Sequence, residues 1–324
     1  MVKKVSRSIL VALAMVFLLS SSSLAQTTTS NAAGYRVSPV REEKTIEKGS
    51  SIVTKIFVEN TTSEPIETKA VVNNFLAEGE SGQPKIDLDN KLEISNDFKK
   101  LVAPIPNFTL EPKQKKEIPV TISVPSNSSP GGYYGAIRFM PTSVADNDAR
   151  ISLSASVGTI FLIEVPGNLS ERLVLEELAV ANAGRKGILF INPSDEMSTI
   201  VRLKNDGNIH SKPFGKITIT KGSKTVEEFE FNALDKGSGN ILPNQIRQFE
   251  DKLKNDKWFG KYKVTANISY GDGGDVITAS KSFWAIPSWL AVLVALGFAA
   301  IVFGAIYFFV KRGTSNKKVS AKRR

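Results

Sequence analysis

The chain of 324 residues contains no cysteine and only one histidine, His210. Without cysteine there are no disulfides, so a small disulfide-stapled scaffold is excluded and the fold has to be stable through burial of its core. A single histidine excludes most zinc enzymes and every catalytic triad that needs a histidine base. The sequence also lacks a G-x-S-x-G element and a P-loop. We therefore expect a protein that is not an enzyme and that carries no metal or cofactor.

Outside its two ends the chain has no net charge. The whole sequence carries 42 Lys and Arg against 32 Asp and Glu, a net charge of +10. Residues 1–25 hold three basic groups and residues 311–324 hold seven, and neither segment contains an acid. These ten groups equal the whole excess, so the region between them is neutral. This balance argues against nucleic-acid binding and assigns the excess charge to targeting and topology.

Residues 289–310 form an uninterrupted apolar stretch of 22 residues without a charged side chain. A helix of ~20 apolar residues spans the ~30 Å hydrocarbon core of a bilayer. The alternative is a helix buried in a soluble core, but a soluble helix of this length normally has a polar face. We therefore predict a transmembrane segment at 284–310, with these border residues: Trp284, Trp289, Tyr307, Lys311 and Arg312.

The basic tail predicts the orientation of this segment. Residues 311–324 carry only basic charges, so they are expected in the cytoplasm, with everything before Trp284 outside. The start of the chain agrees with export. Three basic residues, an apolar run and a small-residue site predict a signal peptide at 1–25, cleaved after Ala25. An uncleaved signal anchor is the alternative. The prediction is a single-pass plasma-membrane protein with an extracellular ectodomain.

Short runs of alternating apolar residues, broken by Pro, Gly, Asn and Asp, fill the region between the two ends. This pattern favours antiparallel β-strands, and no long amphipathic helix is indicated. Residues 76–110 are less regular, and within them 76–90 (LAEGESGQPKIDLDN) are expected to form an exposed, polar excursion rather than core. The predicted fold is all-β, with two tandem immunoglobulin-like sandwiches and one C-terminal helix. The expected parts are a disordered leader at 26–34, a first sandwich at 35–167, a linker or first strand of the second domain at 168–186, and a second sandwich at 187–283.

Three matches in the same order indicate that the two sandwiches repeat one plan. An apolar strand ends at Asn60 in the first and at Asn205 in the second. A Leu-Pro turn follows farther along, at 110–114 and at 242–245. A strand that begins Gly-Tyr at 132–133 has its counterpart in the Gly-Lys-Tyr of 260–262. One match could arise by chance, whereas three in order favour a tandem arrangement.

The segment 129–139 (SPGGYYGAIRF) has the most unusual composition in the ectodomain. Its proline and paired glycines allow a sharp entry into a strand. Tyr133, Tyr134 and Arg138 then form a candidate ligand-binding group, because aromatic and cationic side chains suit stacking on a sugar or gripping a partner. The alternative is a bulged strand whose tyrosines pack inside the sandwich.

Two further polar features have simpler interpretations. Asp87 and Asp89 alternate in a way that suits weak Ca²⁺ binding, but the glycine and glutamate of an EF-hand are missing. A solvated loop is the favoured interpretation. His210 lies in the polar turn after Asn205, where a solvated histidine is expected.

Taken together, these segments resemble the WxL-interacting surface proteins of Gram-positive bacteria. The resemblance rests on YRVSP at 35–39, the strand region 56–72, the glycine-rich run 130–139 and VGTIFLIEVPG at 157–167, with a second β domain and a basic-tailed anchor. It implies peptidoglycan binding by the first domain, and partner-protein or host-ligand binding by the second.

The main hypothesis is therefore a non-enzymatic, membrane-anchored bacterial surface protein that binds cell-wall polymer or another envelope protein. The alternative is a scaffold or chaperone-like subunit of a membrane-bound secretion or adhesion complex.

Overall fold

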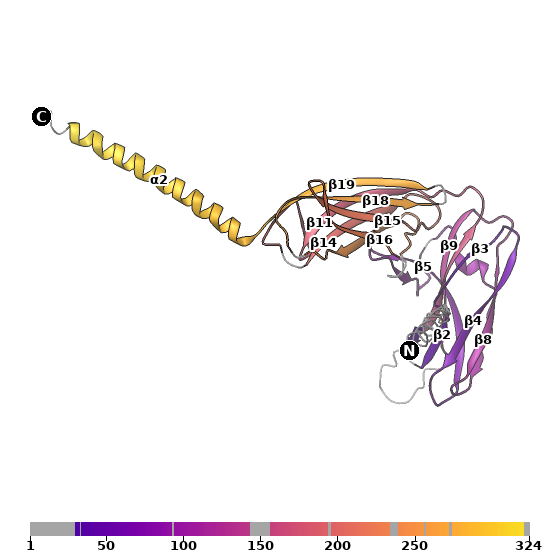
Figure 1. Cartoon of the computed structure of the whole chain (residues 1–324). Helices are drawn as coiled ribbons and strands as arrows, with labels where there is room; N and C mark the ends of the chain where they lie inside the picture. Colours follow the sequence, from indigo (N-terminus) through magenta and orange to yellow (C-terminus); the bar gives the residue numbers. More distant parts are fainter. Residues whose placement is uncertain are drawn as a thin grey trace, which may run out of the picture.

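The computed structural model has three parts in chain order: a first β-sandwich, a second β-sandwich and a long helix that points away from both (Figure 1). It describes residues 30–32, 34–92, 94–142, 156–193, 196–233, 239–255, 257–271 and 274–320. The predicted signal peptide, with cleavage after Ala25, lies outside the described residues and stays a prediction. The predicted all-β ectodomain, with its immunoglobulin-like sandwiches and one apolar C-terminal helix, is confirmed.

Two mainly antiparallel sheets face each other in the first sandwich. One consists, in spatial order, of β1 (Ser30–Ala32), β2 (Tyr35–Ser38), β4 (Ser51–Asn60) and β8 (Lys115–Ser123). The other consists of β3 (Arg41–Thr45), β10 (Val157–Val165), β9 (Gly131–Pro141), β5 (Ile66–Glu78) and β6 (Gln83–Ile86), with β7 (Phe108–Leu110) beside β5. Side chains alternate between the two faces of a strand, and this determines which residues enter the core. In β4, Ile56 and Val58 are fully buried while Lys55 is exposed.

Residues 76–110 are more structured than the irregular stretch expected from the sequence, although every residue of the predicted polar excursion at 76–90 except Asp87 is exposed or partly exposed. This stretch contains the end of β5, all of β6 and a 3₁₀-helix, η1 (Phe98–Leu101). Phe98 and Leu101 are buried, and the Phe98 ring stacks on Phe161 at a centroid distance of 5.5 Å. The Asp97 side chain caps this short helix by accepting the amide of Lys99. Phe98 and Leu101 are thus core residues within a mostly polar segment. Hydrophobic periodicity could not indicate them, because they belong to neither a strand nor an α-helix.

The second sandwich repeats the two-sheet plan. One sheet consists of β12 (Arg185–Gly187), β11 (Leu173–Asn182), β14 (Met197–Asn205) and β17 (Ile246–Lys252). The other consists of β13 (Leu189–Ile191), β19 (Asp275–Ile286), β18 (Gly260–Tyr270), β15 (Phe214–Lys221) and β16 (Lys224–Phe231). The segment 168–186, expected as a linker or a first strand, therefore supplies the first strand of the second sandwich.

Three boundaries differ from the predicted ones. Residues 30–32, expected in a disordered leader, form β1 and pair with β2. The last strand, β19, continues to Ile286, so Trp284 belongs to a strand and not to the helix. The helix α2 (Ser288–Ser320) begins after Pro287 and continues into the basic tail. Within it, Ser288–Phe309 is long and apolar enough to cross a membrane, and none of it is buried against the sandwiches.

A buried asparagine ends β4 in the first sandwich and organises the turn after it. The Asn60 Nδ2 donates to the carbonyls of Glu64 (2.7 Å) and Leu110 (3.1 Å). Its Oδ1 accepts the backbone amide of Thr62 at 2.8 Å. One side chain thus satisfies backbone groups of two separate turns, which explains why a polar residue is fully buried here.

Asn205 makes the same bonds in the second sandwich. Its Nδ2 donates to the carbonyl of the residue four positions on and to that of Ile241, both at 2.8 Å. Its Oδ1 accepts the amide two positions on, also at 2.8 Å. The predicted repeat of Asn60 and Asn205 therefore has a structural basis. The sequence match paired Leu110 with Leu242, but the carbonyl that Asn205 binds belongs to Ile241. The equivalence of the two turns is therefore shifted by one residue.

Candidate functional site

Tyr133 lies at the start of β9 and is buried in the first sandwich, with 5% of its surface exposed. Its hydroxyl donates to the carbonyl of Ser129 at 3.0 Å. In the second sandwich, the Tyr262 hydroxyl reaches back to the carbonyl of Lys257 at 3.5 Å. A tyrosine that hydrogen-bonds to backbone just upstream is the tyrosine corner of immunoglobulin-like domains. Tyr133 therefore fixes a corner, as the alternative interpretation of the sequence expects.

Tyr134 points to the opposite face of β9 because side chains alternate along a strand. Its ring is 8% exposed and packs with Phe75, Leu162 and Leu242. Phe75 and Leu162 belong to the first sandwich and Leu242 to the second, so Tyr134 is buried where the two domains meet. Burial raises the pKa of its hydroxyl. We call the contacts between the sandwiches the junction.

Arg138 is half-buried on β9 and is held by two side chains of its own domain. Its Nε donates to Asn73 Oδ1 at 3.0 Å, and its Nη1 donates to Ser156 Oγ at 3.1 Å. Burial lowers the pKa of its guanidinium. Tyr133, Tyr134 and Arg138 thus point to three different surroundings. The candidate ligand-binding group does not form an exposed platform. The two tyrosine rings lie on opposite faces of β9, and the Arg138 guanidinium is hydrogen-bonded to Asn73.

His210 differs from the predicted solvated histidine. Its Nδ1 lies 3.4 Å from the Tyr134 hydroxyl, and the two rings meet edge to face with centroids 5.7 Å apart. Burial lowers the pKa of the imidazole, while the charge of Glu43 acts in the opposite direction. The turn that carries His210 is polar in sequence, but it faces the first sandwich. Nothing local in the sequence indicates this contact, because its partner lies 76 residues away.

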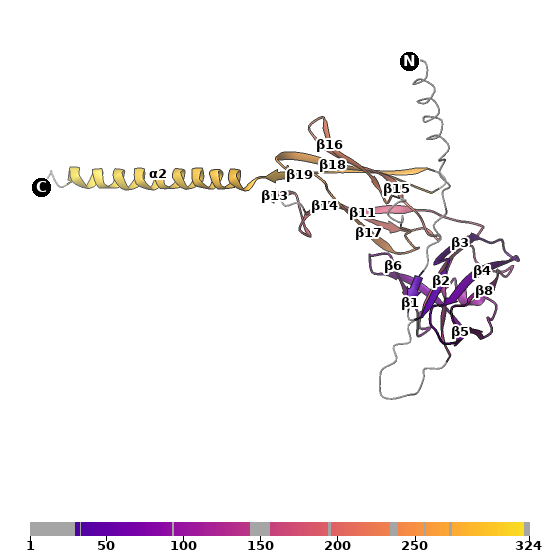
Figure 2. The same ribbon diagram turned by 60° about the horizontal axis from the view of Figure 1, so that its bottom comes forward.

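Polar bonds fix the junction around the buried rings. Arg202 of β14 donates from Nε and Nη2 to the two carboxylate oxygens of Glu80, at 2.7 and 2.5 Å. Glu80 lies in the turn between β5 and β6, and its carbonyl accepts the amide of Gln248 in β17 at 2.9 Å. The amide of Gly132 donates to the carbonyl of Asn208 at 3.0 Å. Figure 2 shows β6 lying against the second sandwich beside β17.

Asp87 and Asp89 do not share a cation-type arrangement. Asp87 is buried, and its two carboxylate oxygens accept the backbone amides of Lys91 and Leu92, both at 3.0 Å. Asp89 instead pairs with the Lys91 ammonium at 3.2 Å. Among the described residues, no cluster of three or more metal-ligating side chains occurs. Asp87 thus organises a turn.

The four sheets have eight outer strands, and most of these are short or covered. β8 is covered because Ala103 donates to the carbonyl of Thr121 at 3.0 Å, and β17 is contacted by the Glu80 turn. β1, β3, β6, β12 and β13 have at most five residues each. β16 has eight residues and pairs with β15 on one side; no described segment forms a ladder along its other side, although its Glu227 carboxylate accepts the backbone amides of Lys254 and Asn255. We call that side the open edge.

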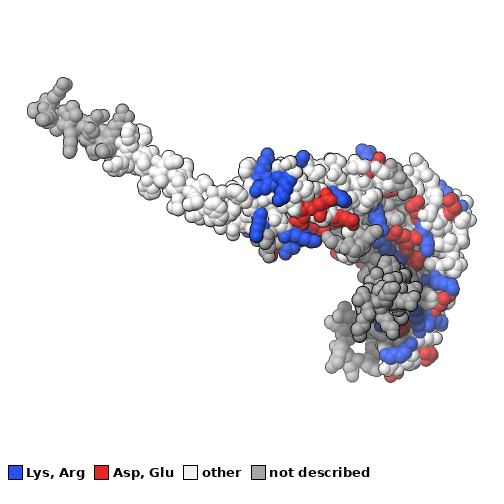
Figure 3. All heavy atoms as spheres, in the orientation of Figure 1, with Lys and Arg blue, Asp and Glu red and all other residues white. Residues whose placement is uncertain are grey.

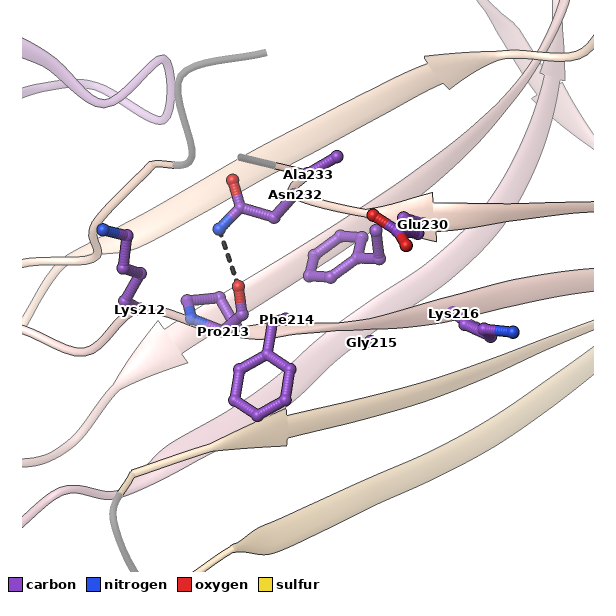
Figure 4. Close-up of a pocket in the computed structure, with 9 residues that line it drawn as sticks. Lys212, Pro213, Phe214, Gly215, Lys216, Glu230, Asn232 and Ala233 are labelled. Atoms are coloured by element: carbon purple, nitrogen blue, oxygen red, sulfur yellow. Dashed lines mark hydrogen bonds between the residues drawn. The ribbon is translucent and has the colours of Figure 1, made fainter. Parts of the chain in front are cut away.

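A surface cavity of about 480 Å³ lies where β15 begins and β16 ends. Phe214 and Pro213 supply apolar lining, and Phe214 is 57% exposed. The Asn232 Nδ2 donates to the carbonyl of Pro213 at 2.7 Å, which ties the two walls together (Figure 4). Glu230 and Lys216 bring opposite charges to the rim. The cavity and the open edge therefore form one continuous candidate site.

The predicted membrane-border residues are divided between strand and helix. Trp289 and Tyr307 lie exposed on α2, near the two ends of its apolar part. Trp284 is exposed on β19, four residues before the helix. Lys311 and Arg312 lie in the helical continuation after the apolar part.

No family profile and no curated protein sequence matches this chain. Similar solved structures include the class 5 fimbriae chaperone CfaA, at 13% identity and a TM-score of 0.39, covering 77% of this chain and 98% of that one. The E. coli chaperone DraB is 16% identical with a TM-score of 0.33, covering 78% and 95%. The CsuC–CsuE chaperone–tip adhesion subunit complex of Acinetobacter baumannii is 17% identical with a TM-score of 0.33, covering 67% and 90%. At these identities the likeness concerns the fold, and no residue role is carried over.

Proposed function

We propose that this chain is a non-enzymatic scaffold or chaperone-like subunit of a membrane-bound complex, and that it holds an extended segment of a protein partner. The observation that carries the proposal is the open edge of β16, which leads into an apolar cavity. An unpaired strand edge is a ready template for another chain, and natural proteins usually cover it. The rest of this ectodomain follows that rule, as the covered edges of β8 and β17 illustrate.

In strand addition, affinity and selectivity come from different contacts. Backbone hydrogen bonds along β16 hold an extended segment whatever its sequence, and pockets for alternate side chains select among segments. Here the cavity lined by Phe214 and Pro213 accepts one apolar side chain. Glu230 is exposed on the outer face of β16 and favours a basic residue beside it.

The junction supports such a role by limiting motion. Tyr134, His210 and the Arg202–Glu80 pair hold the sandwiches in one arrangement. A binding surface that is already ordered loses less conformational entropy when a partner binds. The second sandwich is also attached directly to α2, so β16 begins, at Lys224, at the end of the sandwich next to the helix, and the cavity lies at the opposite end.

Site-specific photocrosslinking in cells tests the proposal. A photoreactive residue replaces Glu230 on the open edge, and a matched variant carries it in place of Glu117, an exposed glutamate on the covered edge strand β8. We expect one discrete protein adduct with the first variant and none with the second. Equal or absent adducts from the two positions would contradict strand addition at β16.

Binding of cell-wall polymer, and of a WxL partner, stays a prediction of the sequence resemblance. Sugar binding was expected from an exposed pair of aromatic residues, but Tyr133 and Tyr134 are both buried. Another surface of the first sandwich would therefore have to bind the polymer. Sedimentation of the detergent-solubilised chain with isolated cell walls tests this function. Retention no greater than that of an unrelated β-sandwich protein removes it, and this result leaves the crosslinking experiment unaffected.

A further inference from the structure

The end of the second sandwich next to α2 carries a row of exposed side chains across three neighbouring strands. Leu189 of β13 lies beside Trp284 of β19, and Trp284 lies beside Lys261 of β18. Neighbours in register on adjacent strands project from the same face of a sheet. We call Leu189, Trp284 and Lys261 the membrane-proximal row.

Further apolar side chains are exposed around this row. Ile188 and Ile191 flank Leu189, and Phe259 immediately precedes β18. Together with Leu189 and Trp284 they are between 49% and 62% exposed. Single exposed apolar residues are ordinary, whereas several gathered at one end of a domain mark an interaction surface. Their packing partner lies outside the sandwich.

Basic residues surround the same end. The described residues of the turns and strand ends that converge there, at 183–193, 196–197, 221–224, 252–255 and 257–261, contain eight Lys and Arg against one acidic residue, Glu196. The Lys221 ammonium lies over the rings of Phe259 and Tyr262, at 5.1 and 5.6 Å from their centroids. Figure 3 shows basic side chains gathered on the end of this sandwich nearest the helix, with acidic ones farther along. A neutral ectodomain has thus concentrated positive charge at one end.

The connection between this end of the sandwich and the helix is one residue long, so the end stays close to any membrane that the helix spans. Only Pro287 separates β19 from α2, and its carbonyl accepts the amides of Leu290 and Ala291 in the first turn. Asn192 also donates to the carbonyl of Ile286 at 2.7 Å, which ties the β13 side to the last residue of β19. At ~3.3 Å per residue, Trp284 lies at most about 13 Å from the start of the helix.

We propose that this end of the second sandwich lies against the headgroup layer of the membrane that α2 spans, with the apolar side chains inserted and the lysines on anionic lipid phosphates. Because Trp284 lies at most about 13 Å from the start of α2, the membrane-proximal row is within reach of the headgroups. Trp favours this layer because its ring is apolar and its N–H is polar. Lysines beside such residues attract anionic lipids. The proposal rests on the helix and not on the proposed function.

Labelling of the full chain in lipid nanodiscs tests the proposal. Because the chain has no cysteine, Leu189→Cys and Val276→Cys each place one fluorophore uniquely. Val276 is a matched control, since it is 60% exposed on the same sheet at the far end of β19. Lipids with a headgroup nitroxide should quench the label at 189 about threefold or more above that at 276, because the two ends of β19 are roughly 26 Å apart at ~3.3 Å per residue.

Lipid charge provides the second arm of the test. Quenching at 189 should increase when anionic lipid replaces part of a zwitterionic bilayer, and Lys257→Gln with Lys261→Gln should reduce that increase. Equal quenching at 189 and 276 overturns the proposal. Quenching at 189 that does not depend on lipid charge overturns the assignment to anionic headgroups. Contact between two labels at 189 without lipid quenching assigns the surface to a second copy of the chain and also overturns the proposal.

Discussion

Tyr134 and His210 meet edge to face between the two sandwiches, 76 residues apart in the chain, with the tyrosine hydroxyl 3.4 Å from Nδ1 of the imidazole. Tyr134 belongs to the first sandwich and His210 to the second, and the Tyr134 ring also packs against Leu242 of the second. The pair therefore exists only when the sandwiches are docked, which makes it a direct reporter of the junction.

The first prediction concerns pH. Burial lowers the pKa of His210 in the folded chain below its ordinary value of ~6.5, so the open or unfolded chain binds the proton more readily. The docked state thus keeps its full stability above pH ~6.5 and loses part of it as the pH falls toward the lowered pKa. Thermal unfolding of the detergent-solubilised chain, followed at several pH values from 7.5 to ~4.5, measures this loss.

The charged groups that face His210 set the control for that experiment. They are Glu43 and Arg41 from the first sandwich and Lys212 from the second. His210→Gln keeps a polar side chain but removes the titration near neutral pH. If the variant retains the same pH dependence as the original chain, the histidine is not responsible.

A second prediction separates packing from hydrogen bonding at Tyr134. Tyr134→Ala removes a buried ring from the junction cluster and should destabilise the docked arrangement by about 3 kcal/mol. Tyr134→Phe keeps the ring and loses only the contact with His210, at a cost of about 1 kcal/mol or less. Calorimetry and small-angle X-ray scattering report stability and domain arrangement. Equal effects of the two substitutions would show that the ring contributes nothing through packing.

A third prediction concerns the two equivalent asparagines. Asn60→Ala and Asn205→Ala each leave two carbonyl oxygens without their amide donor, of which both are buried at Asn205 and one is buried at Asn60, so each should cost about 2–3 kcal/mol in its own sandwich. Asn107→Ala, at an exposed loop position, is the matched control and should change little. Calorimetry with two resolved transitions assigns each effect to a domain. A shift confined to the wrong transition would reject the equivalence.

A fourth prediction concerns the turn between β5 and β6. Glu80→Gln weakens the paired bonds from Arg202, so this turn should detach more often from β17. Limited proteolysis around residues 79–82 and amide exchange at Gln248 should both become faster, and more salt should reduce the difference from the original chain. Glu78→Gln changes an exposed glutamate of the same hairpin and serves as the control. Identical proteolysis of the two variants would argue against a role for the ion pair.

The fold was largely predictable because its signals are local. Period-two alternation marks strands such as β4, and the apolar run marks the helix whatever surrounds it. The repeat was also visible, because Asn60 and Asn205 each bind backbone groups of a turn that their sequence neighbours form. β17 is a strand that alternation does not indicate, because its polar residues show no clear period of two.

The candidate site was less predictable because it depends on contacts between distant segments. Tyr133 and Tyr134 are adjacent in sequence and similar in chemistry, yet one fills a sandwich corner and the other fills the junction. His210 lies in a turn whose polarity suggests solvent, yet it meets Tyr134 of the first sandwich across the junction. An open edge is not a sequence feature at all, since it depends on which strands fail to cover it.

The single residue between β19 and α2 has a consequence for how partners are found. A protein held on a long flexible linker samples a large volume, whereas with α2 in a membrane, as proposed above, the two sandwiches are restricted to a thin layer above the lipid. A partner anchored in the same membrane therefore meets it by diffusion in two dimensions, at a high effective concentration. Modest affinity at the β16 edge is then sufficient for membrane-bound partners and insufficient for soluble ones, so the short connection itself selects between the two.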